Sequence, residues 1–134
     1  MKDIEKIRNS LTSALIRLNE LELSLTKKRS EAIDWDSRTI VNAVANEFGV
    51  ASELFYAKSC PLPVKYARQV AIYLISKHTG IKYSEVCAHF RKNLSGNVYY
   101  VAMKSVMDKM EIDPIYSGKV VRAETAYLIQ KNNK

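Results

Sequence analysis

The side chains best suited to chemistry in this sequence lie close together, between residues 91 and 104. They are cations and hydrogen-bond donors: Arg91, Lys92, Asn93, Ser95, Asn97, Tyr100 and Lys104. Cations of this kind bind phosphate oxygens, while amide and hydroxyl groups bind the edges of bases. The cluster therefore predicts an interface with nucleic acid, in which Arg91, Lys92 and Lys104 contact phosphates and the other four side chains contact bases.

Three helical segments are predicted to position this cluster, over residues 64–78, 83–90 and 97–110. The first ends at Thr79 and Gly80, since glycine readily adopts the left-handed conformation of a helix C-terminus. The inward residues expected of the three segments are Val64, Ala67, Ala71, Leu74 and Ile75, then Val86, Cys87 and Phe90, then Val98, Val101, Ala102, Ser105 and Val106. A short helix, a tight turn and a longer helix form a helix-turn-helix, whose second helix enters the major groove of DNA.

The other segments from residue 36 onward are also predicted to be helical or loop. A helix capped by Asp36 or Ser37 would end at Gly49, and a single helical turn over 52–57 would bury Leu54 and Phe55. A loop with two prolines follows, and Lys58 and Lys65 at its ends are placed to flank the groove. A last helix over 117–130 would turn inward its apolar residues, Val120, Val121, Ala123, Leu128 and Ile129. Strand signals are weak, so the expected fold class is all-α.

Residues 1–29 contain no glycine or proline and read as one long helix. Its apolar residues alternate by three and four, which is the spacing of a coiled-coil seam. They are Ile4, Ile7, Leu11, Ala14, Leu18, Leu21 and Leu25. We expect residues 1–35 to form an arm that joins two copies into a homodimer, with a charged hinge at 27–31 and Trp35 covering the core of a domain over 36–134. Packing of the arm on its own chain is the alternative.

The net charge of the 134-residue chain is +7, and most of it lies after residue 35. Residues 36–134 hold fourteen Lys and Arg against eight Asp and Glu. A basic domain attracts polyanions, nucleic acid first among them. No apolar run approaches the length of about 20 residues that crosses a bilayer, and the N-terminus does not resemble a signal peptide, so we expect a cytoplasmic protein with reduced cysteines and no membrane partner.

The sequence offers little to an enzyme. His78 and His89 lie eleven residues apart on different predicted helices, with no carboxylates at the spacing of metal ligands. One residue of the pair Tyr99 and Tyr100 is expected in the core and the other on the surface. The phosphate-binding pattern GxxxxGK[ST] does not occur in these residues. We therefore expect no catalytic activity, metal or cofactor.

Residues 40–113 resemble the C-terminal DNA-binding domain of the bacterial replication initiator DnaA. The resemblance rests on Ala-Arg-Gln-Val-Ala-Ile-Tyr-Leu at 67–74, on the Thr79 that follows, and on Glu85, Val86 and Phe90. It covers a little over half of the chain. It implies that Arg68 approaches the phosphate backbone of DNA and that Asn97 occupies a place where the family has a threonine near phosphate.

Two departures from the family pattern limit what the resemblance implies. Where the initiators have an arginine-rich loop, this sequence has Ser-Cys-Pro-Leu-Pro at 59–63. Where they have Gly-Gly-Arg-Asp-His-Thr-Thr, it has Arg-Lys-Asn-Leu-Ser-Gly-Asn at 91–97, without the family's base-reading side chains. The resemblance thus implies the fold and the docking mode, but not the DNA sequence bound.

The sequence as a whole predicts a protein that binds double-stranded DNA in the control of replication or transcription. The alternative is an adaptor that has kept the DnaA fold but binds replication or transcription proteins instead of DNA. The departures at 59–63 and 91–97 favour the adaptor, whereas the basic charge of residues 36–134 favours DNA binding.

Overall fold

The computed structural model describes the backbone of residues 2–57, 61–90 and 96–133, and the side chains of these residues except 2–5, 7, 23 and 25–30. The chain is all-α over these ranges, as predicted, with no strand in them. Its elements are α1 (Lys2–Phe48), a 3-10 helix η1 (Ser52–Tyr56), α2 (Leu62–Thr79), α3 (Tyr83–Phe90), α4 (Gly96–Ile112) and α5 (Pro114–Asn132). By its internal contacts the chain divides into two compact units, Met1–Asp34 and Trp35–Lys134.

The predicted break near residue 30 is wrong, because α1 is helical from Lys2 to Phe48. This stretch has no glycine or proline, and the Lys, Arg and Glu residues around 27–31 are good helix formers, so their charge does not interrupt the helix. Asp36 and Ser37 do not cap a new helix. Ser37 is buried, and Asp36 accepts a hydrogen bond of 2.8 Å from the phenol of Tyr127 in α5.

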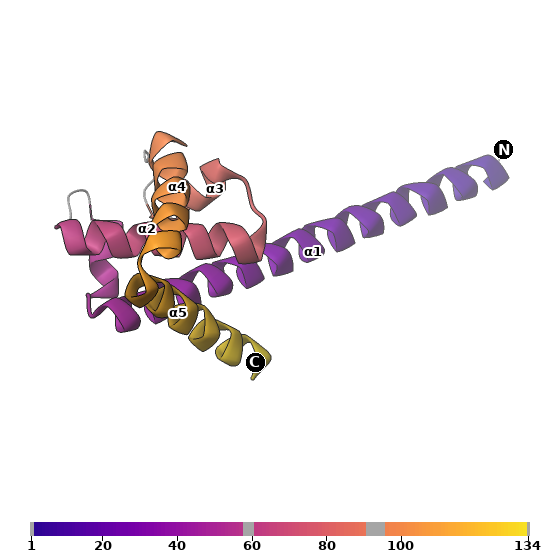
Figure 1. The fold of residues 1–134 in the computed structure, drawn as a ribbon. Coiled ribbons are helices and arrows are strands. Elements are labelled where there is room, and N and C mark those ends of the chain that lie inside the picture. The colour runs from indigo at the N-terminus through magenta and orange to yellow at the C-terminus, as the bar shows by residue number, and fades with distance from the viewer. Residues whose placement is uncertain (1, 58–60, 91–95, 134) are drawn as a thin grey trace. The chain divides into compact units, whose positions relative to one another are not determined.

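Helix α2 is the central element of unit 2 and contacts η1, α3 and α4. Figure 1 shows that α4 crosses α2. All five of its predicted inward residues are buried, and so are Arg68, Gln69, Val70 and Ile72. A helix that is buried on most of its sides is a core helix rather than an amphipathic surface helix. It ends as predicted, because Gly80 adopts the left-handed conformation with φ of 65°.

Several residues expected in the core are exposed instead. Leu54 is 41% exposed while its neighbour Phe55 is fully buried, and Val101 of α4 is 49% exposed while Ala102 and Val106 are buried. Helix α5 begins at Pro114, where Asp113 caps it through hydrogen bonds from the backbone N–H groups of 115 and 116. Its buried residues are Val120, Ala123 and Tyr127, and the predicted Val121, Leu128 and Ile129 lie on its exposed side.

Polar contacts fasten α5 to the other helices of unit 2. The carboxylate of Glu124 lies 2.8 Å from Nζ of Lys77 and 2.8 Å from Nε2 of His78, both in the last turn of α2. Arg122 donates a hydrogen bond of 2.6 Å to Glu47 near the end of α1. Trp35 is partly buried against the core, as expected. The core thereby holds α2, α3 and α4 in the arrangement that forms the site.

Candidate nucleic-acid interface

The outward face of α4 carries three of the described residues of the predicted interface, Asn97, Tyr100 and Lys104. Asn97, Tyr100, Val101 and Lys104 are all exposed, at the spacing of three and four residues that places side chains on one side of a helix. On the opposite side, Ala102 and Val106 are fully buried in the core that α4 shares with α2. The core therefore fixes which way this face points. Val101 belongs to it, although the sequence had suggested a core position.

Three tyrosines pack together at the start of α4. The ring of Tyr83, in the first turn of α3, lies 5.8 Å from the ring of Tyr100 and 6.0 Å from that of Tyr99, and the last two rings are 5.3 Å apart. Tyr99 is partly buried and Tyr100 is 60% exposed, which confirms the expected division between core and surface. Tyr83 is 47% exposed, and sequence reasoning missed it because only the folded chain brings it beside Tyr100.

Gly96 permits the close approach of α3 to the start of α4. A Cβ atom at this position would lie 3.0 Å from Cε2 of the Tyr83 ring, which is closer than nine in ten Cβ contacts. The glycine thus leaves room for the ring against the first turn of α4. Oη of Tyr99 lies 2.7 Å from Oγ of Ser76, which fixes the same turn to α2.

Arg68 is buried in the domain and is only 7% exposed. Its Nε atom has no hydrogen-bond partner among the described residues. Burial raises the pKa of the neighbouring Cys87 thiol. A backbone hydrogen bond from Tyr99 and the charge of Arg68 lower this pKa, but they do not outweigh burial. Arg68 therefore lies near the junction of α2, α3 and α4, and its contact with phosphate remains a prediction.

The remaining cations of the predicted interface divide into two groups. Lys65 is exposed on α2, and Lys104 is exposed on α4. The others, with two of the expected base-contacting residues, lie outside the described residues: Lys58, Arg91, Lys92, Asn93 and Ser95. Their contribution to the interface is predicted by the sequence alone.

Both histidines make contacts that join elements of the domain. Nε2 of His89 lies 3.1 Å from Oη of Tyr56, whose ring is stacked on Phe90 with centroids 5.8 Å apart. The ring of His78 contacts Glu124, as described above, and lies 5.2 Å from the ring of Tyr127. These contacts tie η1 to α3 and α2 to α5, so both histidines have structural partners.

Residues 37–102 match the family model described as the bacterial DnaA protein helix-turn-helix. These residues form a helix-turn-helix domain of the DnaA type. The match takes in the second part of α1, all of η1, α2 and α3, and α4 as far as Ala102. It includes Arg68, the three tyrosines and Asn97, and it confirms the resemblance noted in the sequence. The matched family model describes a helix-turn-helix and not a catalytic domain.

One relative is the chromosomal replication initiator protein DnaA of Bacteroides fragilis, which is 28% identical to this chain over 142 residues. The alignment takes in 99% of this chain and 29% of that protein. The chain thus spans less than a third of the initiator's length. None of the described helices is both long enough and apolar enough to cross a membrane.

Proposed function

We propose that this chain binds double-stranded DNA through its DnaA-type domain, with the first two turns of α4 in the major groove. The observation that carries the proposal is the match over residues 37–102, which takes in Asn97, Tyr100 and Val101 on the outward face of α4. In a helix-turn-helix, the residues at the N-terminal end of the second helix contact base edges. The net basic charge of residues 36–134 favours the same partner, since phosphate contacts supply much of the affinity of DNA-binding proteins.

The exposed side chains of α4 suit contacts of two kinds. Asn97 and Tyr100 carry polar groups that can bind base edges, and Lys104 carries a cation suited to a phosphate one turn further along the helix. Tyr100 and Val101 are 60% and 49% exposed, and both present apolar surface. In the major groove, such surface contacts the C5-methyl group of thymine, which distinguishes T from the other bases.

The phosphate contacts proposed around this helix come from several elements. Lys65 on α2 and Lys104 on α4 are exposed. Lys58, Arg91 and Lys92 lie outside the described residues and are proposed as further phosphate contacts from the sequence alone. Asn93 and Ser95 are proposed as further base contacts next to Asn97. Arg68 is proposed to reach a phosphate with the end of its guanidinium group, although most of the side chain is buried.

The direct test is a titration of the full chain against duplex DNA, measured by fluorescence anisotropy at several salt concentrations. A chain that contacts about six phosphates should give a slope near −5 in a plot of log affinity against log salt, since each contact releases a condensed counterion. Selection from a random duplex library then gives the preferred sequence. Absence of binding at a low salt concentration of about 20 mM would exclude DNA binding and favour the adaptor.

Single-residue variants locate the interface. Lys104→Ala should weaken binding to all duplexes and lower the salt slope by about one. Lys131→Ala in α5 removes the same charge outside the proposed interface and is the matched control. Equal effects of the two variants would show that binding depends on net charge and not on α4.

On the similarity to a chromosomal replication initiator, we propose that the chain acts in the cytoplasm, in the control of replication or transcription. Homodimerisation through the first 25 residues is also proposed. Ile4, Ile7 and Leu25 lie outside the residues whose side chains the structure describes. The other seam residues carry the inference that follows.

A further inference from the structure

The described part of the arm exposes a row of leucines that no described residue of its own unit covers. Leu11, Leu18 and Leu21 are 61%, 55% and 60% exposed. With Ala14 they occupy successive positions three and four residues apart. These are positions a and d when the heptads are counted from residue 4. Exposed leucines at this spacing are typical of a helix whose partner is another helix.

The polar flanks of this row carry opposite charges. In the same heptad numbering, Arg17 occupies position g of residues 11–17 and Glu22 occupies position e of residues 18–24. Both side chains are exposed. In a parallel, in-register pair of helices, position g of one helix faces position e of the next heptad in its partner. A second copy of this chain would therefore bring Arg17 against Glu22 twice, once on each side of the seam.

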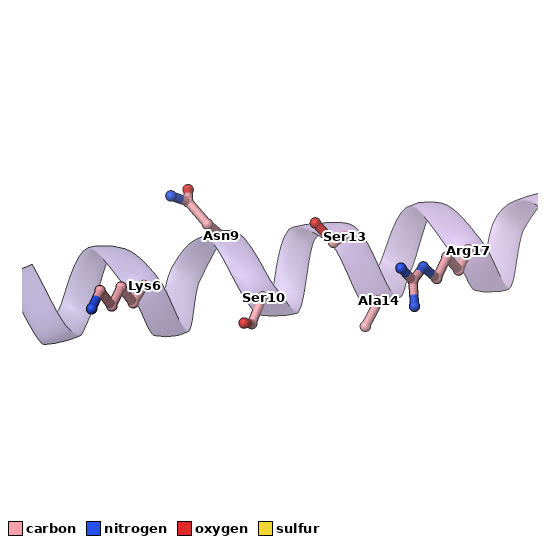
Figure 2. Close-up of a pocket in the computed structure, with 6 residues that line it drawn as sticks. All are labelled: Lys6, Asn9, Ser10, Ser13, Ala14 and Arg17. Carbon is pink, nitrogen blue, oxygen red and sulfur yellow. The ribbon is translucent and has the colours of Figure 1, made fainter.

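Figure 2 shows how the side chains near the middle of the row are directed. Ser10 and Ala14 point to one side of α1, and Asn9 and Ser13 point to the other. The shallow hollow that these residues line with Lys6 and Arg17 belongs to one helix alone, and is not an enclosed cavity for a ligand. The small side chains at Ser10 and Ala14 leave room for a neighbouring helix to approach closely.

An antiparallel pair accommodates these charges less well. In that arrangement position e faces e of the partner and position g faces g. The register that pairs Arg8 with Glu22 of the partner also brings the two Arg17 side chains together. The register shifted by one heptad sets Arg17 opposite Ser10 of the partner. In that register Glu22 faces no charged residue of the partner's described arm. Charge complementarity thus favours the parallel orientation.

We propose that two copies of this chain associate through Leu11, Ala14, Leu18 and Leu21 as a parallel, in-register coiled coil whose register is set by Arg17 and Glu22. The proposal concerns residues 8–22 and does not depend on DNA binding. The described seam, from Leu11 to Leu21, spans fewer than two heptads, so the association is expected to depend on protein concentration.

The first experiment measures the mass of the full chain by sedimentation equilibrium over a range of concentrations. The mass should rise from the 15.3 kDa of one chain to that of two copies. Leu18→Glu should remain a monomer at every concentration, because it places a charge in the seam. Ile16→Glu, at position f on the outer side, should leave the association unchanged. A wild-type monomer, or an assembly larger than two copies, would overturn the proposal.

The second experiment tests the charged pair. Arg17→Glu and Glu22→Arg should each weaken self-association by about 3- to 10-fold, because each variant sets like charges against each other at two places. An equimolar mixture of the two variants should associate better than either variant alone, as should the double variant Arg17→Glu/Glu22→Arg. Circular dichroism checks that each variant keeps its helical content. Equal association of all these proteins would show that the pair does not contribute.

The third experiment determines orientation. Leu21→Cys, in a chain that also carries Cys60→Ser and Cys87→Ala, should form a disulfide-linked dimer under mild oxidation if the helices are parallel and in register. In the two antiparallel registers described above, Leu21 lies at least ten residues along the seam from its counterpart, or about 15 Å, and no such link forms. Ile16→Cys in the same background is the control. Failure of Leu21→Cys to link while the chain sediments as a dimer would refute the parallel orientation.

Discussion

The phenol of Tyr99 lies 2.7 Å from the hydroxyl of Ser76, and this contact joins the first turn of α4 to the last turn of α2. Tyr99 also forms part of the aromatic cluster with Tyr83 and Tyr100. The turn that presents Asn97 and Tyr100 is thus held both by ring packing and by a partly buried hydrogen bond.

Removal of the Tyr99 hydroxyl should destabilise the domain. Tyr99→Phe leaves Ser76 without this partner and should lower the free energy of unfolding by about 1 kcal/mol. For a domain of this size the melting temperature should fall by about 4–8 °C. Tyr100→Phe removes a hydroxyl from an exposed ring and should have no measurable effect on stability. Thermal denaturation followed by circular dichroism compares the two, and equal melting temperatures would show that the Ser76 contact contributes nothing.

Stability should depend on pH through Glu124. Burial raises the pKa of this carboxyl, but hydrogen bonds from Lys77 and His78 outweigh burial and hold the pKa below its ordinary value of 4.5. A carboxylate whose pKa is lowered in the folded state stabilises the protein above pH 4.5, and this stabilisation is lost as the pH falls through the folded-state pKa.

Glu124→Gln should therefore lower the free energy of unfolding by about 1 kcal/mol at pH 7. The difference from the wild type should shrink as the pH is lowered from 5 through the folded-state pKa of this carboxyl, because the native carboxyl is then protonated. Melting temperatures across this range measure the effect, and Glu111→Gln on the exposed surface of α4 serves as the control. A difference that stays constant with pH would assign the effect to packing rather than to charge.

Local patterns predicted the ends and inner faces of the helices around the site. Thr79 and Gly80 end α2 because glycine readily adopts a positive φ, which is a property of the residue and can be read from the sequence. The buried residues of α3 and two of those predicted for α4, Ala102 and Val106, followed from the helical period. The helices of the helix-turn-helix and most of their buried faces could therefore be inferred before the structure.

Tertiary packing decided the features that the sequence did not predict. Val101 and Leu128 are apolar, and only the positions of neighbouring helices determine that they face outward. Tyr83 lies on a different helix from Tyr100, and no spacing within either helix indicates that their rings meet. The charged residues at 27–31 suggested a hinge, but charge alone does not end a helix that lacks glycine and proline.

Replacement of Arg68 should weaken DNA binding without lowering the stability of the domain. Replacement of a buried charged group by an apolar one of similar size is often neutral or stabilising, and Nε of Arg68 lacks a partner among the described residues. Arg68→Met should therefore keep or raise the melting temperature. It should also weaken DNA binding and lower the salt slope by about one, if the guanidinium reaches a phosphate. Unchanged affinity in a stable variant would remove Arg68 from the proposed interface.

Tyr100 and Val101 should make DNA binding sensitive to the methyl groups of thymine. In the preferred duplex obtained by selection, replacement of thymidine by deoxyuridine removes only the C5-methyl group of the base. Loss of one buried methyl contact, worth about 0.8 kcal/mol, should weaken binding about fourfold at each position that these side chains read. Anisotropy titrations of the two duplexes at one salt concentration measure the ratio.

The double variant Tyr100→Ala/Val101→Ala should bind the thymidine and deoxyuridine duplexes equally, because it lacks the apolar surface that contacts the methyl groups. Ile129→Ala removes an apolar side chain from the exposed face of α5, where Ile129 is 55% exposed, and should keep the full preference for thymidine. If the wild type binds DNA but does not distinguish the duplexes, α4 does not present these two residues to thymine. Binding with the expected salt slope would then still support the DnaA-type domain as the DNA-binding element.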